Sequence, residues 1–508
     1  MARFIARRLA LAVGTLFILS FLMYGLLEFA LDPLADLREN PAPNREELIA
    51  NRIRLLNLDV PWYQRYFMWL GNFLTGDFGI AWRTMQPVGT LVRGAIATSI
   101  QLVFAATIIS ILLGVTIGLV SALRQYTTFD YAITFVSFLL YSLPIFWVAV
   151  LLKQFLAIGA NDYLQNPTIN WPAVVLLSIV SGLFWAGALG GKRPRKLQVF
   201  GAAFVVTLAV LAGTLLTGWV NNPSIGIIGV GVLSIALALG VTAIFAGINN
   251  KRALYSALTT AVLGTILWWP LQWLFFYQEM NWAWILGLLA LALVIAAAIG
   301  WLFGGPDRQI SMRGTMITAL FTSILIFVDR VLQTWIPYNN APQIRGRPLA
   351  TIGASTPGLQ ADFWMEQLDR ATHIMLPTLA LVLISFATYV RYQRGAMLEV
   401  LNQDYIRTAR AKGLSERVVI VRHALRNALM PLASIVPVDF ITLIGGAVIT
   451  ETIFGWAGMG RLFITSMAGQ EVDPVMFYII LTGGLAMIAN LVADFLYAVI
   501  DPRIRVNA

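Results

Sequence analysis

The sequence predicts an all-α protein that crosses a membrane about twelve times, a number set by its apolar runs. Of its 508 residues, 58% are hydrophobic and only 12% are charged, whereas soluble domains contain about 45–50% apolar and about 25% charged residues. The runs reach about 20 residues, which is the length that a helix needs to span a bilayer. Basic residues gather in short connections between the runs, as is typical of cytoplasmic loops. Together these features exclude an ordinary soluble fold.

The composition also limits the kinds of ligand. The net charge of +10 does not indicate nucleic-acid binding, because the basic residues are spread over loops instead of forming a patch. The absence of cysteine excludes disulfides, zinc ribbons and thiol nucleophiles. The two histidines, His373 and His423, lie far apart in the chain, so we expect no metal site.

The first apolar run follows Arg7 and Arg8 and has no clear cleavage site, so we interpret it as a retained helix with a cytoplasmic N-terminus. A long polar segment to about residue 96 then gives only a weak topology signal. The predicted spans are 9–30, 98–123, 131–156, 171–189, 197–220, 225–248, 253–277, 282–303, 316–336, 374–389, 429–449 and 475–500. Pro144 lies inside the third span, where we expect it to kink the helix and to face protein or a cavity.

Loop chemistry supports the number of spans between residues 159 and 371. Connections 192–196, 249–252 and 307–313 are basic, whereas 221–224 is neutral and 278–281 is acidic. If the third span ends outside, every basic connection lies inside. The six spans of this region then return the chain to the outside, and both termini are cytoplasmic.

The segment 404–431 predicts a helix, a sharp break at Gly413 and a second helix. Lys412 followed by glycine is a stop signal, and the Ser415 hydroxyl is available to cap the next helix. The expected apolar face of the second helix carries Val418, Val421, Leu425 and Ala428, and another face carries Arg422, His423 and Arg426. Such an amphipathic helix pair on the inside is suited to docking on a cytoplasmic protein.

This segment resembles the EAA loop of ATP-binding-cassette importer permeases, in the form found in the dipeptide/oligopeptide B type. Arg407, Thr408, Ala409 and Gly413 stand at the positions of Glu, Ala, Ala and Gly in the general motif. Further stretches resemble the same family in the same order, at 76–79, 141–144, 423–427, 451–460 and 501–505. The resemblance covers about 1–158 and 370–508, and the ordered set makes it specific.

The resemblance implies the type I importer transmembrane fold, with six family helices and six inserted ones. The implied divisions are 1–96, an N-terminal helix and extracytoplasmic segment; 97–158, the first part of the transport domain; 159–371, the insertion; and 372–508, the second part, with a coupling loop at 399–430. The insertion starts and ends outside, so it leaves the family topology intact. It is suited to shielding the pore, binding lipid or contacting another subunit.

In this family an extracytoplasmic binding protein delivers the solute, here a peptide, and two permeases enclose the pathway. The resemblance therefore implies a C-type permease, two cytoplasmic ATPases, a binding protein and membrane lipid as partners. The sequence has no phosphate-binding loop, so ATP and Mg²⁺ belong to the ATPases and this chain is not an enzyme. The residues implied in ATPase coupling are Arg407, Thr408, Ala409, Lys412, Gly413, Leu414, Ser415, Arg422 and His423.

Several interpretations stay open. Pro144, Glu451 and Asp494 are candidates for the pathway or its gate, although the two carboxylates also suit structural pairing. Asp329 and Arg330 suggest a local ion pair or snorkelling. The solute could be an oligosaccharide or a nickel chelate, which the same permease type carries. Twelve spans also fit a secondary transporter, whereas a membrane enzyme would need catalytic clusters that the spans lack.

Overall fold

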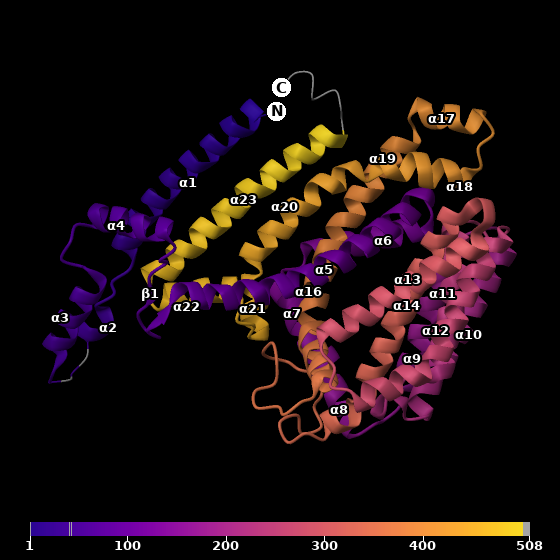
Figure 1. Ribbon diagram of the computed structural model, residues 1–508, viewed down its shortest axis with the longest axis horizontal. Coiled ribbons are helices and arrows are strands. Elements are labelled where there is room, and N and C mark those ends of the chain that lie inside the picture. The colour runs from indigo at the N-terminus through magenta and orange to yellow at the C-terminus, as the bar shows by residue number, and fades with distance from the viewer. Residues whose placement is uncertain (1, 40, 42, 501–508) are drawn as a thin grey trace.

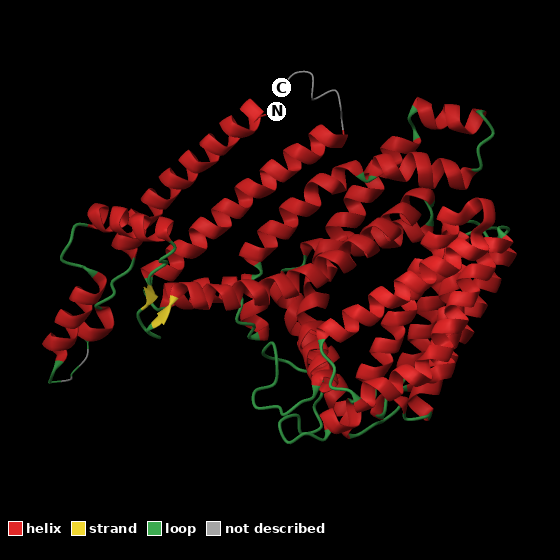
Figure 2. Ribbon diagram, in the orientation of Figure 1, coloured by secondary structure: helices red, strands yellow, loops and turns green. Residues whose placement is uncertain are grey.

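The protein is built almost entirely from helices (Figure 2). The computed structural model describes residues 2–39, 41 and 43–500. Within them, ten helices are long and apolar enough to cross a membrane, or eleven when the bent pair Glu416–Ala428 and Met430–Ile441 counts as one span. The predicted all-α polytopic fold class is therefore confirmed, and the protein is a multi-pass membrane protein.

The longest of these candidates, Trp282–Leu332, consists of two helices. They are α13 (Trp282–Gly304) and α14 (Arg308–Leu332), joined by the 3₁₀ turn η3 (Gly305–Asp307). The two helices pack along each other. A Cβ on Gly300 would lie 2.5 Å from Met312 Cα, so this glycine allows the close approach. Spans 282–303 and 316–336, predicted separately, are indeed two helices.

The core centres on α5 and α16, which pack against each other more extensively than any other pair among the described residues. Gly114 and Gly118 of α5 face Tyr389 and Gln393 of α16, and a Cβ on Gly114 would lie 2.5 Å from Tyr389 Cβ. Small residues permit such close helix contacts in membranes. The core helices are α1 (Ala2–Ala30), α5 (Val88–Leu123), α6 (Thr128–Ser142), α7 (Ile145–Leu151), α16 (Phe363–Leu401), α20 (Met430–Gly446) and α23 (Val472–Ile500).

The predicted third span, 131–156, is wrong in its bounds. Helix α6 ends at Ser142, and Leu143 and Pro144 are extended, with ψ of 129° and 138°. Proline disfavours a helical residue before it and lacks the amide needed to continue the helix, so the chain breaks here instead of kinking. It resumes as α7, the π-helix η1 (Leu152–Ile158) and α8 (Gly159–Gln165), which together form one candidate span. The helix thus runs beyond residue 158, where the insertion was predicted to begin.

The inserted region forms a bundle at one side of the molecule (Figure 1). Besides α13 and α14 it contains α9 (Trp171–Leu189), α10 (Arg193–Leu216), η2 (Trp219–Asn221), α11 (Gly226–Phe245) and α12 (Lys251–Tyr277). Helices α11, α12, α13 and α14 pack on one another, and α9 pairs with α10. The α9–α10 pair rests on α6 through Phe129, whose ring meets Phe184 edge-on at 5.5 Å.

Asp329 of α14 holds the inserted bundle together, and the predicted ion pair with Arg330 is wrong. The carboxylate is fully buried and accepts hydrogen bonds from the amides of Ile225 (2.6 Å) and Gly226 (2.9 Å). It also accepts from Trp268 Nε1 at 2.8 Å and Gln333 Nε2 at 3.0 Å. The free amides at a helix N-terminus favour a carboxylate, and here they belong to α11.

The two ends of the insertion lie side by side, joined by Asn161 and Leu349, and we call this junction the neck. Asn161 of α8 donates to the Leu349 carbonyl at 2.9 Å and accepts from the Leu349 amide at 3.0 Å. Nearby, Tyr338 in α15 (Trp335–Asn339) donates to the buried Asp369 of α16 at 3.0 Å. Asp369 also accepts from the Thr356 hydroxyl at 2.6 Å. The loop between α15 and α16 is therefore fastened to the start of α16.

The remaining elements form the two ends of the molecule in Figure 1. The start of α1 and the end of α23 lie at the same end as α17. The opposite end carries α2 (Ala35–Arg38), α3 (Arg45–Leu56), α4 (Trp62–Thr75) and the antiparallel pair β1 (Ile80–Ala81) and β2 (Gln86–Pro87), in which Ile80 faces Pro87. The short helices before α23 are α17 (Asp404–Ala411), α18 (Glu416–Val418), the π-helix η4 (Val419–Leu425), α19 (Arg426–Ala428), α21 (Val448–Phe454) and α22 (Met459–Ala468).

Candidate functional site

Residues 404–428, the coupling segment, project from one end of the molecule (Figure 1). The predicted helix, break and second helix are all present. Helix α17 ends at Ala411 with Lys412 as its C-cap, and Gly413 then adopts a φ of +73°, a left-handed conformation that favours glycine. Ser415 stands at the N-cap of α18, but its exposed hydroxyl makes no capping bond there, contrary to the prediction.

The second helix buries a different face from the one predicted. Val419, Ala424 and Ala428 are fully buried, whereas Val421 is 50% exposed. The spacing of five between Val419 and Ala424 follows from the π-helix, in which hydrogen bonds join residues five apart. The prediction assumed α-helical spacing and therefore placed Val421 on the wrong face.

An apolar cluster fastens the coupling segment to the core. Ile406 and Ala409 of α17 pack with Met397 of α16, Ala122 of α5 and Val419 of η4. Ile406 and Met397 are completely buried. Ala409, one of the residues implied in ATPase coupling, is 7% exposed and faces the core. Any movement of α17 therefore acts directly on the ends of α5 and α16.

Two side-chain contacts lock the two halves of the segment across the break. The Arg410 guanidinium grips the Glu416 carboxylate with two bonds, Nη2 to Oε1 at 2.7 Å and Nε to Oε2 at 3.2 Å. This hydrogen-bonded carboxylate raises the pKa of Arg410. On the far side, Asn427 Nδ2 donates to the Tyr405 hydroxyl at 2.7 Å. The bend at Gly413 is thus held in one geometry.

The outer face of the bend is basic with an apolar tip. Leu414 is 41% exposed beside Gly413, and the exposed charges near it are the cations Lys412 and Arg417 and the Glu416 carboxylate, which Arg410 pairs. Of the other predicted coupling residues, His423 is half-buried and the following are exposed: Arg407, Thr408, Lys412, Ser415 and Arg422. An exposed leucine within a basic rim is suited to a pocket with an acidic edge on another protein.

Two arginines connect the core to the inserted bundle near this segment. Arg417 of α18 donates through Nη2 to the carbonyls of Ala243 and Ile244, at the end of α11. Arg124, just after α5, donates to the Leu189 carbonyl at the end of α9 at 2.5 Å. Cations are favoured at the free carbonyls of helix C-termini. Sequence reasoning missed both contacts, because each joins segments with no local pattern in common.

A buried ion pair fixes α16 to α6 and α5. Asp130 of α6 accepts from Arg394 Nε at 2.7 Å and from Arg394 Nη2 at 2.9 Å. The same carboxylate accepts from Ser121 Oγ at 2.6 Å and from the Tyr126 amide at 3.1 Å. Only 2% of the Asp130 side chain is exposed. The paired groups therefore clamp three helices next to the cluster beneath α17.

The predicted candidates for the pathway or its gate differ in how far they are buried. Pro144 is exposed at the break between α6 and α7, so of the two predicted surroundings, protein or a cavity, it does not face protein of this chain. Asp494 lies in α23, but its side chain lies outside the described residues. Asp439 of α20, which sequence reasoning missed, is half-buried beside Tyr389 of α16. The isolated carboxylate within an apolar run was the available signal.

Glu451 is buried, and its contacts are structural. Ser99 of α5 donates to its Oε1 at 2.6 Å, and the Arg461 amide at the start of α22 donates to Oε2 at 3.0 Å. A Cβ on Gly458 would lie 2.2 Å from Glu451 Oε1, so the turn before α22 wraps closely around the carboxylate. Of the two interpretations of Glu451, these contacts favour the structural one.

Replacing Glu451 with glutamine is expected to lower the free energy of unfolding by about 1–3 kcal/mol, the cost of leaving buried polar groups mismatched. The new amide would point a donor at the Arg461 amide or at Ser99. Thermal unfolding of the purified protein, followed by circular dichroism, measures the effect. Glu366→Gln is the control, since that carboxylate is 48% exposed on α16. Equal melting temperatures for the two variants would contradict the structural role.

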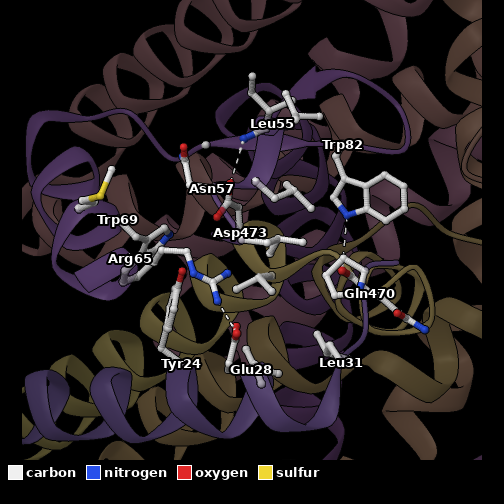
Figure 3. Close-up of a pocket in the computed structure, with 18 of the residues that line it drawn as sticks. Tyr24, Glu28, Leu31, Leu55, Asn57, Arg65, Trp69, Trp82, Gln470 and Asp473 are labelled. Atoms are coloured by element: carbon white, nitrogen blue, oxygen red, sulfur yellow. Dashed lines mark hydrogen bonds and ion pairs between the residues drawn. The ribbon is translucent and has the colours of Figure 1, made fainter. Parts of the chain in front are cut away.

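A small cavity lies beside α4 and the start of α23 (Figure 3). It has a volume of about 160 Å³ and is lined by residues of α1, α3, α4, β1 and α23. Arg65 pairs with Glu28 at its edge, and the Ile80 amide donates to Asp473 at 3.3 Å. A Cβ on Gly79 would lie 2.1 Å from the Asp473 carboxylate, and its φ is +81°. The Gly-Asp-Phe-Gly stretch at 76–79 thus packs directly against the start of α23.

Part of this chain matches a family of transport components. Residues 307–506 match the family described as binding-protein-dependent transport system inner membrane component. The match begins just before α14, within the predicted insertion, and runs through the coupling segment.

Curated relatives carry names of peptide transport systems. The oligopeptide transport system permease protein of Mycobacterium tuberculosis is 43% identical over 155 residues, covering 30% of this chain and 48% of the relative. That of Bacillus subtilis is 41% identical over 184 residues, with coverage of 36% and 53%. The dipeptide transport system permease protein of Escherichia coli is 44% identical over 138 residues, with coverage of 27% and 41%. The chain thus spans about half the length of these relatives.

Proposed function

We propose that the chain is a permease subunit of an ATP-binding-cassette peptide importer, and the premise of this proposal is the match of residues 307–506 to the family of binding-protein-dependent inner membrane transport components. It would form half of the translocation pathway with a second, C-type permease. An extracytoplasmic binding protein would deliver the peptide, and two cytoplasmic ATPases would bind ATP and Mg²⁺. The choice of peptide as solute rests on the names of the relatives; an oligosaccharide or a nickel chelate is the alternative.

The coupling segment carries this proposal. It is a rigid, bent helix pair with an exposed Leu414 at its tip and an apolar root on α5 and α16. A surface of this shape transmits force from a docked protein into the packed core, since cores shift between discrete arrangements and do not deform smoothly. The proposed topology places this segment and both termini in the cytoplasm, which agrees with the position of this segment, the start of α1 and the end of α23 at one end of the fold (Figure 1).

In this mechanism closure of the ATPases would move α17 and α18 as one unit. The Arg410–Glu416 ion pair and the Asn427–Tyr405 hydrogen bond join the two sides of the bend, so that they move together. The apolar cluster around Ile406 and Met397 passes it to α16, and the Asp130–Arg394 pair carries α6 along. The break at Pro144 lies at the other end of α6. It is suited to absorb the change of angle between α6 and α7.

Reconstitution tests the proposal directly. The chain would be purified with whatever subunits it retains from its native cells and placed in liposomes with ATP enclosed and a candidate binding protein outside. We expect uptake of labelled oligopeptides that depends on both ATP and the binding protein. Uptake driven by an ion gradient without ATP would overturn the proposal in favour of a secondary transporter.

A further inference from the structure

The inserted bundle contains a pocket of about 470 Å³ between the end of α12, the end of α14 and the start of α16. Its volume lies within the range of about 300–1,000 Å³ that is typical of small-molecule sites. The residues that define it are Phe276, Tyr277, Glu279, Arg330, Asp362 and Trp364. No residue of the coupling segment lines this pocket, and the core contributes only the start of α16, far along that helix from the cluster around Met397.

Arg330 is the one cation among the residues that line the pocket. Its guanidinium lies 5.9 Å from the Phe276 ring and 5.8 Å from the Trp364 ring. It donates to Gln333 Oε1 at 3.2 Å, while its Nε is buried without a hydrogen-bond partner. Asp329 is its neighbour in sequence, but the Asp329 carboxylate accepts hydrogen bonds from four other donors. In the part of the chain that the structure describes, no carboxylate lies within ion-pair distance of Arg330.

The surface around the pocket indicates where it sits in the bilayer. Exposed aromatic side chains ring this end of α12 and α13, and Tyr277 and Phe276 are each 69% exposed. The others in this ring are Trp269, Trp273, Trp282 and Trp284. Trp and Tyr gather at the level of the lipid headgroups, where their amphipathic rings are favoured. The pocket therefore opens at a membrane–water interface, at the end of the bundle opposite α17.

We propose that this pocket binds the headgroup of a phospholipid that carries an ammonium group, such as phosphatidylethanolamine, with its phosphate on Arg330. A guanidinium with unused donors suits phosphate oxygens, which it binds in a planar fork. Glu279 and Asp362 also line the pocket, where their carboxylates can meet the ammonium, although Asp362 accepts from the Met365 amide at 2.9 Å as the N-cap of α16. The acyl chains would lie on the exposed aromatic surface of α12. With α17 in the cytoplasm, as the proposed function requires, this interface belongs to the outer leaflet; only that assignment rests on the proposed function.

Native mass spectrometry of the full chain, titrated with lipid after delipidation, tests the proposal. We expect dioleoyl phosphatidylethanolamine to bind wild type, and Arg330→Gln to weaken that binding about tenfold, the effect of losing about 1.4 kcal/mol of charge-assisted contact. Arg308→Gln is the matched control. Arg308 also belongs to α14 and stacks on an aromatic ring, that of Trp301 at 4.6 Å, but at the opposite end of the helix. The Arg308→Gln variant should therefore bind the lipid as wild type does.

A second variant and a competitor separate the alternatives. Glu279→Gln, on an exposed residue, should remove the preference for phosphatidylethanolamine over phosphatidylglycerol while binding of the latter stays unchanged. Inorganic phosphate should not displace the lipid at equal concentration. The lipid assignment is overturned if Arg330→Gln and Arg308→Gln bind alike, or if phosphate competes equally. Peptide uptake plays no part in this measurement, so its result stands apart from that of the proposed transport function.

Discussion

Replacing Gly413 with valine is expected to reduce the amount of ATPase recovered with the purified chain about tenfold, which corresponds to about 1.4 kcal/mol. Gly413 has a φ of +73°, and a β-branched residue in this conformation is strained by about 1–3 kcal/mol. A Cβ at this position would meet no atom within 4 Å, so packing is not disturbed. The bend relaxes to escape the strain, and Leu414 moves away from its docking position.

Asparagine at the same position is the matched control, because it tolerates the left-handed conformation. Gly413→Asn should keep most of the ATPase, although it adds a side chain of similar size. Both variants should melt within a few degrees of wild type, since the site is exposed. If valine and asparagine retain the ATPase equally, the geometry of the bend does not govern docking. If the wild-type chain carries no ATPase, the importer assignment itself is wrong.

Replacing Asp130 with asparagine is expected to destabilise the fold by about 3 kcal/mol, because removing one partner of a buried ion pair leaves the other charge uncompensated. Asp130 is the acceptor for four donors, two of them on Arg394. Asparagine can accept at only one oxygen and would point an amide at the guanidinium. The loss is measured as a fall in the thermal unfolding temperature of the purified chain.

Helix α16, which carries Arg394, also offers a matched control in Glu366 and Arg370. These residues form an ion pair at 2.5 Å with both side chains nearly half exposed. Exposed pairs contribute only about 0–1 kcal/mol, so Arg370→Gln should melt close to wild type. The double variant Asp130→Asn, Arg394→Gln should recover part of the stability lost in the single variant, since no charge is then left unpaired. A single variant as stable as Arg370→Gln would refute the clamp between α6 and α16.

The helices could be predicted from sequence because lipid leaves the backbone few choices. Each unpaired amide in the bilayer is costly, so an apolar run such as 225–248 must be a helix, and α11 occupies it. The break at Gly413 could also be predicted from sequence, because it depends on local signals that end a helix. Pro144 shows the limit. Whether a proline kinks or ends a helix depends on neighbours that can satisfy the freed carbonyl, and the sequence does not name them.

The candidate site was predictable in position but not in orientation. Ala409 belongs to the motif, yet it faces the core because α17 must bury one side on Met397 and Ala122. Val421 was assigned to the wrong face, since nothing local distinguishes a π-helix from an α-helix. The contact of Arg417 with the end of α11 joins residues about 170 positions apart. Such contacts depend on how two bundles settle against each other, which no periodicity encodes.

The neck at Asn161 and Leu349 has a consequence for the order of assembly during synthesis. Helix α5 emerges long before α16, its main packing partner, and two residues 188 positions apart must meet before that pair can form. Closing a flexible loop costs free energy that grows with the logarithm of its length. If the inserted helices fold first, they bring both ends of their own segment together and shorten the effective loop to a few residues. The insertion then templates the pairing of the two core halves, and its removal would change how fast the core assembles more than how stable it is.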